Sequence, residues 1–442
     1  MAYSKKIQEA LGKAKAGIGD RVIVGPAEGL LMPSPEITAS PDHIVLKLDN
    51  GYNIGVKYEG QTVTKSGKPE PKAIAKEYKY ETTGHSKVKQ ASRTRSIALL
   101  GAGGTITSKV DYSTGAVNTK MTGEDLLALV PEVAGIAHID FKTVLEVMSE
   151  DIGPSEWQLL AAEAAKAANS ADGVIITHGT DTMHYTAAAL SFMLDTPKPV
   201  IITGAQRSSD RGSTDSALNL VCSAHAALSD VAEVAICMHG STSDDSCLLI
   251  RGTKARKMHS TMRNAFRPIN DYPLAKVFPN GKIEATGTYR KRATGKAAAD
   301  TKFEEKTALL KAYPGADPKI IDYYVGLGMR GLVIEGTALG HVPTKSKNSW
   351  IPSIKAAVAS GVPVVVATQC IYGTVNPDVY TNLRILYHDA GAIPAYDMTP
   401  ETAYVKLGWV LAHAKGKDVA AMMATNLRGE INARIEPDMF LY

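Results

Sequence analysis

Two motifs rich in glycine and threonine, each directly after an apolar run, constrain this chain more than any other feature. Residues 96–106 read Ser-Ile-Ala-Leu-Leu-Gly-Ala-Gly-Gly-Thr-Ile, and residues 173–183 read Gly-Val-Ile-Ile-Thr-His-Gly-Thr-Asp-Thr-Met. An apolar run ended by glycines and hydroxyl side chains is typical of a buried parallel strand, and open α/β sheets bind their ligands at the carboxyl ends of such strands. We therefore expect the hydroxyl groups of Thr105 and Thr180 to meet at one sheet edge.

From residue 96 onward, apolar strands alternate with alanine-rich helical stretches, as a mostly parallel sheet requires. The pattern predicts strands at residues 96–100, 173–177, 199–203 and 234–238, and helices at 156–168 and 214–228. A second alternation after residue 306 predicts strands at 331–335 and 362–367 and a helix at 400–413. The charged segment 280–305 suits a linker. The sequence therefore predicts an α/β fold with two lobes.

The start of the chain has a different character. Short strands and an Asn50-Gly51 turn indicate antiparallel hairpins, so we expect a small β-barrel over residues 1–85. A linker then runs to about residue 95, and lysine and arginine outnumber acidic residues between 64 and 95. This stretch is either a solvated linker or a contact for a polyanion such as RNA. We assign residues 96–290 to a large α/β domain that carries the active site, and 291–442 to a smaller carboxyl-terminal α/β domain.

Charge and cysteine content exclude some classes of protein. The net charge of +4 over 442 residues gives no general case for nucleic-acid binding. No apolar run approaches the roughly 20 residues of a membrane span, and the first residues lack the apolar stretch of a secretory signal. Four cysteines without CxxC spacing argue against a structural zinc site and favour a cytoplasmic setting. We expect all four to fill the core: Cys222, Cys237, Cys247 and Cys370.

The residues after the two strands suggest nucleophilic chemistry. The glycines at 103 and 104 let the backbone approach a ligand closely, but taken alone this motif is better explained by Thr105 capping a turn. The second motif places Thr180 beside Asp181, and Lys257 lies in a separate loop. A threonine hydroxyl needs a base to take its proton, and a lysine oriented by a carboxylate can serve. The alternative for Asp181 and Lys257 is an ordinary ion pair.

Four motifs in this order resemble the bacterial-type asparaginase and glutaminase family. They are Gly-Gly-Thr-Ile, Thr-His-Gly-Thr-Asp-Thr-Met, Thr-Gly-Ala-Gln-Arg at 203–207 and Lys-Met-His-Ser at 257–260, and the resemblance covers about residues 96–413. It implies a larger lobe with a flavodoxin-like parallel sheet and a smaller carboxyl-terminal α/β lobe. It also implies hydrolysis of a side-chain amide through an acyl-enzyme on threonine, and it leaves open which threonine attacks first.

The same resemblance assigns the site residue by residue. Thr105, Thr180, Asp181 and Lys257 match the catalytic set; Lys254 is a nearby rival, but the spacing from Lys257 to Phe266 fits the family loop better. The residues expected to bind substrate are Ser149 and Glu150 for the amino-acid head group, together with Gly104, Gly179 and, in the loop 109–117, Tyr112. No metal is expected.

Along its whole length the chain is similar to one branch, the archaeal-type glutamyl-tRNA(Gln) amidotransferase D subunits. The barrel, the basic linker and the ending at 428–442 carry this resemblance. It implies that glutamine is hydrolysed to supply ammonia to a partner, the amidotransferase E subunit, which binds Glu-tRNA(Gln) and uses ATP and Mg²⁺. This chain itself is then expected to need no cofactor, and it has no Gly-x-x-x-x-Gly-Lys-Ser/Thr phosphate loop. A homodimeric core is also expected.

Two other functions stay open. One is a stand-alone cytoplasmic L-asparaginase with an accessory barrel, which accepts asparagine. The other is a catalytically silent scaffold subunit, against which the complete set of catalytic residue types speaks. Hydrolysis of glutamine and asparagine by the isolated chain, with and without partner and charged tRNA, separates the three.

Overall fold

The computed structural model describes residues 3–32, 42–48, 53–66, 95–104, 108–111, 116–119, 130–207 and 214–441. Thr105, Tyr112 and most of the basic linker lie outside these residues. The chain divides into two compact units. The first comprises residues 1–88, 108–121 and 210–212, and the second comprises 89–107, 122–209 and 213–442. Both predicted α/β lobes belong to the second unit. Our division into three domains stays a prediction.

The first unit is built on a five-stranded antiparallel sheet with the order β4-β3-β2-β1-β5. Its elements are α1 (Lys5–Lys13), β1 (Arg21–Val24), β2 (Ala27–Leu31), β3 (His43–Lys47), β4 (Asn53–Lys57) and β5 (Val63–Lys65). The expected hairpin is present, since β3 pairs with β4. Among the described residues no pairing joins β5 to β4, so a closed barrel is not confirmed. Ile7 and Leu11 of α1 belong to a core that this sheet shares.

The second unit contains an eight-stranded sheet with the order β18-β17-β14-β13-β12-β10-β6-β9. The strands are β6 (Ser96–Gly101), β9 (His138–Thr143), β10 (Gly173–Thr177), β12 (Val200–Thr203), β13 (Val234–His239), β14 (Cys247–Arg251), β17 (Ala275–Val277) and β18 (Ile283–Ala285). The five from β9 to β13 in this order are parallel, as expected. β18 corrects the expectation of a plain linker over 280–305, because three residues at a sheet edge are too few to show a strand period.

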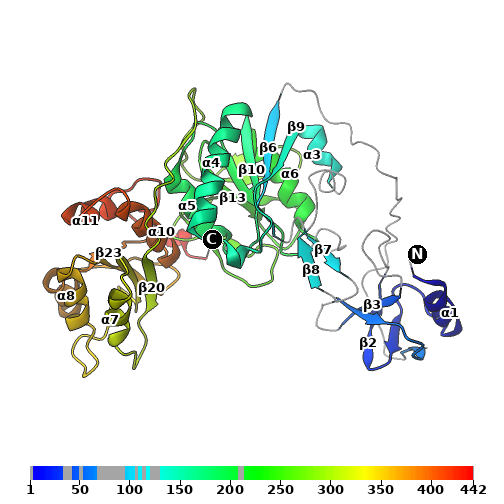
Figure 1. Cartoon of the computed structure of the whole chain (residues 1–442). Coiled ribbons are helices and arrows are strands. Elements are labelled where there is room, and N and C mark those ends of the chain that lie inside the picture. Colours follow the sequence, from blue (N-terminus) through cyan, green and yellow to red (C-terminus); the bar gives the residue numbers. More distant parts are fainter. Residues whose placement is uncertain are drawn as a thin grey trace. The chain divides into compact units, whose positions relative to one another are not determined.

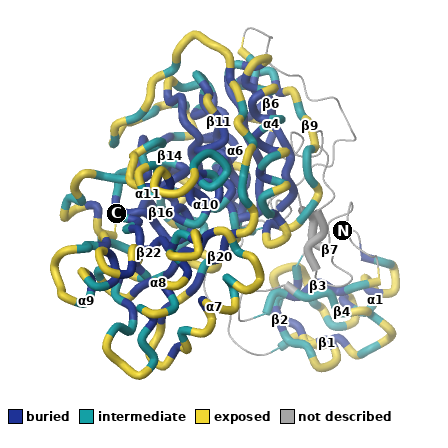
Figure 2. The backbone as a smooth tube through the Cα atoms, turned by 60° about the vertical axis from the view of Figure 1, so that its left-hand side comes forward, coloured by how far each residue is buried: buried dark blue, intermediate teal, exposed yellow. Residues whose placement is uncertain are grey.

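Helices cover both faces of this sheet, which explains its continuous apolar strands. They are α3 (Pro131–Ile136), α4 (Pro154–Ser170), α5 (Met183–Met193) and α6 (Ser216–Ala227). Figure 1 shows these helices around the sheet. Ile176 packs in one core with α4 and α5, whereas its neighbour Ile175 packs in another with α3 and α6. Figure 2 shows the sheet strands buried along most of their length. The turns at the carboxyl ends of β6 and β10 are thereby held on a rigid support.

The smaller lobe of this unit has a four-stranded parallel sheet, β20-β21-β22-β23. Its elements are β20 (Thr307–Lys311), α7 (Lys319–Gly326), β21 (Gly331–Gly336), α8 (Ile351–Ala359), β22 (Val364–Thr368), α9 (Thr381–Arg384), β23 (Ile393–Pro394), α10 (Pro400–Leu411) and α11 (Lys417–Ala424). Val405 of α10 is buried in the same core as α4 and α5. This helix therefore joins the two lobes.

Two smaller expectations can also be compared with the structure. Cys222, Cys237 and Cys247 are buried as expected, but Cys370 is exposed, because it follows the end of β22 in a surface loop. Within the described part of the chain, none of the helices combines the length and apolar character needed to cross a bilayer.

Candidate functional site

The turn between β10 and α5 presents the second threonine motif. β10 ends at Thr177, and α5 begins at Met183. The side chain of Thr180 is buried with 6% of the residue exposed, whereas 67% of the Asp181 side chain is exposed. The turn therefore holds a buried hydroxyl next to a carboxylate that is exposed to solvent.

Lys257 reaches this turn from another part of the fold. It is the last residue of β15 (Ala255–Lys257), which pairs with β16 (Phe266–Pro268). Its Nζ lies 2.9 Å from Oγ1 of Thr180 and 2.7 Å from Oδ1 of Asp181. Three of the four residues expected to be catalytic are thus in direct contact. An amine that touches both groups can exchange a proton with the hydroxyl while the carboxylate holds it in place.

The rival lysine is engaged elsewhere. Nζ of Lys254 lies 2.6 Å from Oδ2 of Asp397 in the smaller lobe, and its side chain is fully buried. Burial lowers the pKa of Lys254 from its ordinary value, and the neighbouring Asp397 opposes this shift. Lys254 therefore joins the lobes and does not contact Thr180.

Glycines bring the predicted substrate-binding residues together. Gly104 has φ +85°, and a β-carbon on it would lie 2.2 Å from the amide nitrogen of Gly179. A β-carbon on Gly179 would in turn lie 2.7 Å from Oγ of Ser149. The turns at Gly104 and Gly179 are therefore packed backbone against backbone, and Gly179 lies against the side chain of Ser149, which leaves no room for a β-carbon at either glycine. Backbone N–H groups in such a turn are suited to stabilise an oxyanion.

Ser149 and Glu150 lie in a short 3₁₀ turn, η2 (Ser149–Asp151). Ser149 is buried, and its carbonyl accepts a hydrogen bond from the hydroxyl of Thr182, two residues after Thr180. Glu150 is exposed. Thr105 directly follows Gly104 in the chain, but both Thr105 and Tyr112 lie outside the described residues.

His178, which precedes Gly179, is a further residue of the site and was not predicted from the sequence. Its Nδ1 lies 2.6 Å from the carbonyl oxygen of Gly179, and its Nε2 lies 2.9 Å from the hydroxyl of Thr186. Since a carbonyl only accepts, Nδ1 carries the proton and Nε2 accepts from Thr186. Burial lowers the pKa of His178 to about 4, so the ring is neutral. The only sequence signal was its position between a strand end and a glycine.

A second histidine, His184, lies near Lys257. His184 is buried, its Nδ1 has no hydrogen-bond partner, and its ring packs on Tyr185. Burial, together with the positive charges of Arg256 and Lys257, lowers the pKa of His184 to about 3. A neutral imidazole ring therefore lies close to the positive charges of Arg256 and Lys257.

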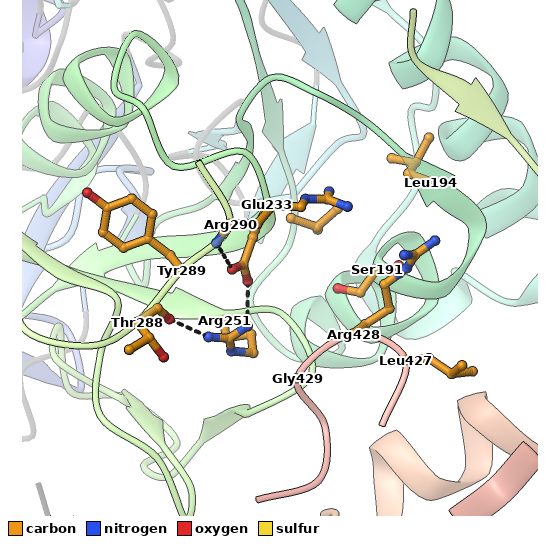
Figure 3. A pocket seen from close by; sticks show the side chains of 11 residues that line it. Ser191, Leu194, Glu233, Arg251, Thr288, Tyr289, Arg290, Leu427, Arg428 and Gly429 are labelled. Atoms are coloured by element: carbon orange, nitrogen blue, oxygen red, sulfur yellow. Dashed lines mark hydrogen bonds and ion pairs between the residues drawn. The ribbon is translucent and has the colours of Figure 1, made fainter. Parts of the chain in front are cut away.

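Within the described residues, neither a metal cluster nor the pocket of Figure 3 adds to this chemistry. Among the described residues, no group of three His, Cys, Asp or Glu side chains is placed to hold a metal ion. A pocket of about 330 Å³ shares no residue with the predicted site (Figure 3). In it Glu233 accepts from Nη1 of Arg251 at 2.8 Å and from the backbone N–H of Arg290 at 2.7 Å. Glu233 therefore accepts from two donors within this pocket.

Comparison with known proteins places each part of the chain. Residues 96–290 match the model of the asparaginase amino-terminal domain, and 306–423 match the glutaminase/asparaginase carboxyl-terminal domain. Residues 18–65 match the GatD N-terminal domain. The glutamyl-tRNA(Gln) amidotransferase D subunit of Thermococcus kodakarensis is 48% identical over 452 residues, which cover 99% of both chains.

The chain belongs to the family of glutamyl-tRNA(Gln) amidotransferase D subunits. The D subunits of Pyrococcus furiosus and Methanothermobacter thermautotrophicus are 47% and 42% identical and match 99% and 98% of this chain, and 100% and 98% of their own lengths. Members of this family thus share the amino-terminal domain as well as the two α/β lobes.

The solved structures confirm the asparaginase-like fold of the two lobes. The thermostable L-asparaginase from Thermococcus kodakarensis has a TM-score of 0.69 and 28% identity, covering 77% of this chain and 100% of its own. L-asparaginase I from Vibrio cholerae has a TM-score of 0.66 and 30% identity, covering 76% of this chain and 99% of its own. The protein is therefore of the asparaginase type of amidohydrolase.

Proposed function

We propose that this protein hydrolyses glutamine and passes the released ammonia to a partner subunit, which converts Glu-tRNA(Gln) to Gln-tRNA(Gln). The observation that carries the proposal is the contact of Lys257 with both Thr180 and Asp181, in a chain that matches amidotransferase D subunits over nearly its full length. The relatives' names supply the tRNA reaction, and the site supplies the hydrolytic chemistry. A scaffold without activity would not need a lysine at this position.

We assign the chemistry to a threonine acyl-enzyme. A threonine hydroxyl, Thr105 or Thr180, attacks the carboxamide carbon, the C–N bond breaks, and the nitrogen leaves as ammonia after taking a proton. Water then attacks the ester, which releases glutamate and restores the hydroxyl. The Thr180, Asp181 and Lys257 cluster moves the protons, and backbone N–H groups near Gly104 and Gly179 stabilise the oxyanion.

The partner reaction requires chemistry that we place outside this chain. A tRNA-linked carboxylate must be activated before ammonia can replace its oxygen, and we assign ATP and Mg²⁺ to the partner, the amidotransferase E subunit. Ammonia must reach that site before it is protonated or lost to solvent, so we expect a closed path within the complex. A homodimeric core of this protein is part of the same proposal.

The test is ammonia release by the purified chain with glutamine or asparagine, alone and with the E subunit and Glu-tRNA(Gln). We expect glutamine hydrolysis that rises when the complex and charged tRNA are present. Equal activity with asparagine and no response to partner or tRNA would favour a stand-alone asparaginase. If the protein releases no ammonia under any of these conditions, the scaffold function is the remaining alternative.

A further inference from the structure

The strand that carries Lys257 is too short to hold the lysine by itself. β15 has three residues, and in the described part of the chain it pairs only with β16, which also has three. A two-stranded ribbon of this length has little stability of its own. Other contacts must fix where Lys257 stands. Ala255 of β15 and Phe266 of β16 are buried in the core that contains α4 and α5.

Further contacts, made by polar side chains, come from the smaller lobe. Nη2 of Arg256 lies 2.9 Å from Oε1 of Glu401, in the first turn of α10. The hydroxyl of Thr402, the next residue of α10, donates to the carbonyl of Thr253 at 2.9 Å. The buried Lys254 ion pair adds a third connection. The backbone just before Lys257 is therefore attached to the amino-terminal end of α10.

Side chains alternate along a strand, so Arg256 and Lys257 point to opposite sides of β15. The guanidinium of Arg256 reaches Glu401 in the smaller lobe, and the amine of Lys257 reaches Thr180 in the larger lobe. Because one rigid peptide plane links the two residues, a shift of Arg256 moves Lys257 with it.

Glu401 depends on this contact. Only 9% of its side chain is exposed, and its Oε2 is buried without a hydrogen-bond partner. Glu401 lies in the amino-terminal turn of α10, where a negatively charged side chain interacts favourably with the helix dipole. If Arg256 were removed, a buried charge would lose its cation, and this end of α10 would have to rearrange.

We propose that Arg256, through its ion pair with Glu401, is a positioning residue that holds Lys257 against Thr180 and Asp181. The inference rests on the proposed function of that site. The smaller lobe then sets the geometry of the lysine in the larger lobe, and a movement of α10 changes the contact of Lys257 with Thr180.

The test compares Arg256→Gln and Glu401→Gln with the control Arg251→Gln. Arg251 forms an ion pair with Glu233 at 2.8 Å, with side chains similarly buried, but it is not on β15. Two quantities are measured: kcat and KM for ammonia release from glutamine, and the rate at which an amine reagent labels Lys257, read by peptide mass spectrometry.

We expect Arg256→Gln and Glu401→Gln each to lower kcat by at least about tenfold with KM changed less than about threefold, as for a group that positions the reacting residues. The double variant should be no slower than the slower single one, because the pair acts as a unit. Labelling of Lys257 should become at least about threefold faster, since a side chain released from its partners is more accessible. Arg256→Lys, which keeps the charge, should restore part of kcat.

Unchanged kcat and labelling in Arg256→Gln would overturn the inference, and so would equal losses in Arg251→Gln. If Arg256→Gln does not fold, Glu401→Gln and Arg256→Lys decide by the same two readouts. Wild-type protein that releases no ammonia, but whose Lys257 labelling still responds to Arg256→Gln, would refute the proposed function and leave the positioning contact standing.

Discussion

At the scale of single residues, two lysines three positions apart have different partners. Lys254 is buried against Asp397, and Lys257 contacts Thr180 and Asp181. Residue type does not separate them, but the direction of each side chain does. Replacing Lys257 should therefore impair catalysis, whereas replacing Lys254 should impair stability.

Lys257→Met should lower glutamine hydrolysis by at least about a hundredfold, the effect of losing a proton-transfer group. The stability of this variant should change little, because Asp181, the carboxylate partner of Lys257, is mostly exposed. Lys254→Met should instead cost about 3–5 kcal/mol of stability, since Asp397 keeps a buried charge without its cation. Urea unfolding and ammonia release by the folded protein check both. A stable but inactive Lys254→Met would show that the wrong lysine was chosen.

Thr180→Val should also lower hydrolysis by at least about a hundredfold, because it keeps the shape and removes the hydroxyl. Thr105→Val should do the same if both threonines take part. The control is Thr196→Val, which removes another buried hydroxyl, one that donates to the carbonyl of Lys198 at 2.9 Å. It should leave kcat near normal. Near-normal turnover in folded Thr180→Val would contradict the assignment.

At the scale of elements, the turns after β6 and β10 depend on glycines in close contact. Gly104→Ala adds a β-carbon 2.2 Å from a backbone atom of Gly179 at φ +85°. Gly315→Ala is matched in backbone, with φ +86°, but has open space around it. We expect Gly315→Ala to cost about 1 kcal/mol and to stay active. Gly104→Ala should lose activity as well as stability, measured by the same two assays. Equal activity and stability in Gly104→Ala and Gly315→Ala would argue against close packing of the two turns.

The histidine at the end of β10 makes stability depend on pH. The pKa of His178 is lowered to about 4 in the folded protein, against an ordinary value near 6.5. Its contribution is therefore fully present above about pH 6.5 and is lost as pH falls toward 4, at about 1.4 kcal/mol per pH unit. His178→Gln should flatten the dependence of unfolding free energy on pH by this amount over that window. If the curves of unfolding free energy against pH are parallel for the wild type and His178→Gln, His178 is not buried in its neutral form.

At the scale of the whole molecule, the two units have separate apolar cores. The core of the first contains residues between 3 and 63, and the cores of the second start at residue 97. A chain that begins near Arg93 should therefore fold and hydrolyse glutamine within about tenfold of the full chain, as separate domains usually can. Residues 108–121, which belong to the first unit, remain in this variant.

Coupling to the tRNA reaction should suffer in the same variant. Transamidation of Glu-tRNA(Gln) by the complex should fall, because members of the family share the amino-terminal domain. If the basic segment 64–95 touches RNA, transamidation by the full complex should weaken steeply with added salt, and the truncated one should respond less. A truncated chain that transamidates like the full one would make the domain dispensable and favour a stand-alone enzyme.

The sequence by itself determined the α/β fold, most strand positions and which residue types could do the chemistry. Apolar runs such as 173–177 identify buried strands, because both faces of the sheet are covered, and the motifs after them mark the sheet edge. The motif resemblance already favoured Lys257 over Lys254, and the structure shows Lys257 in contact with Thr180. Only the tertiary structure decided that His178 bonds to Gly179 and Thr186 and that Arg256 pairs with Glu401. Thr180 and Lys257 lie far apart in the chain, as do Arg256 and Glu401, and a three-residue strand is too short to show a periodic pattern. Packing of the two lobes, not local pattern, selects these contacts.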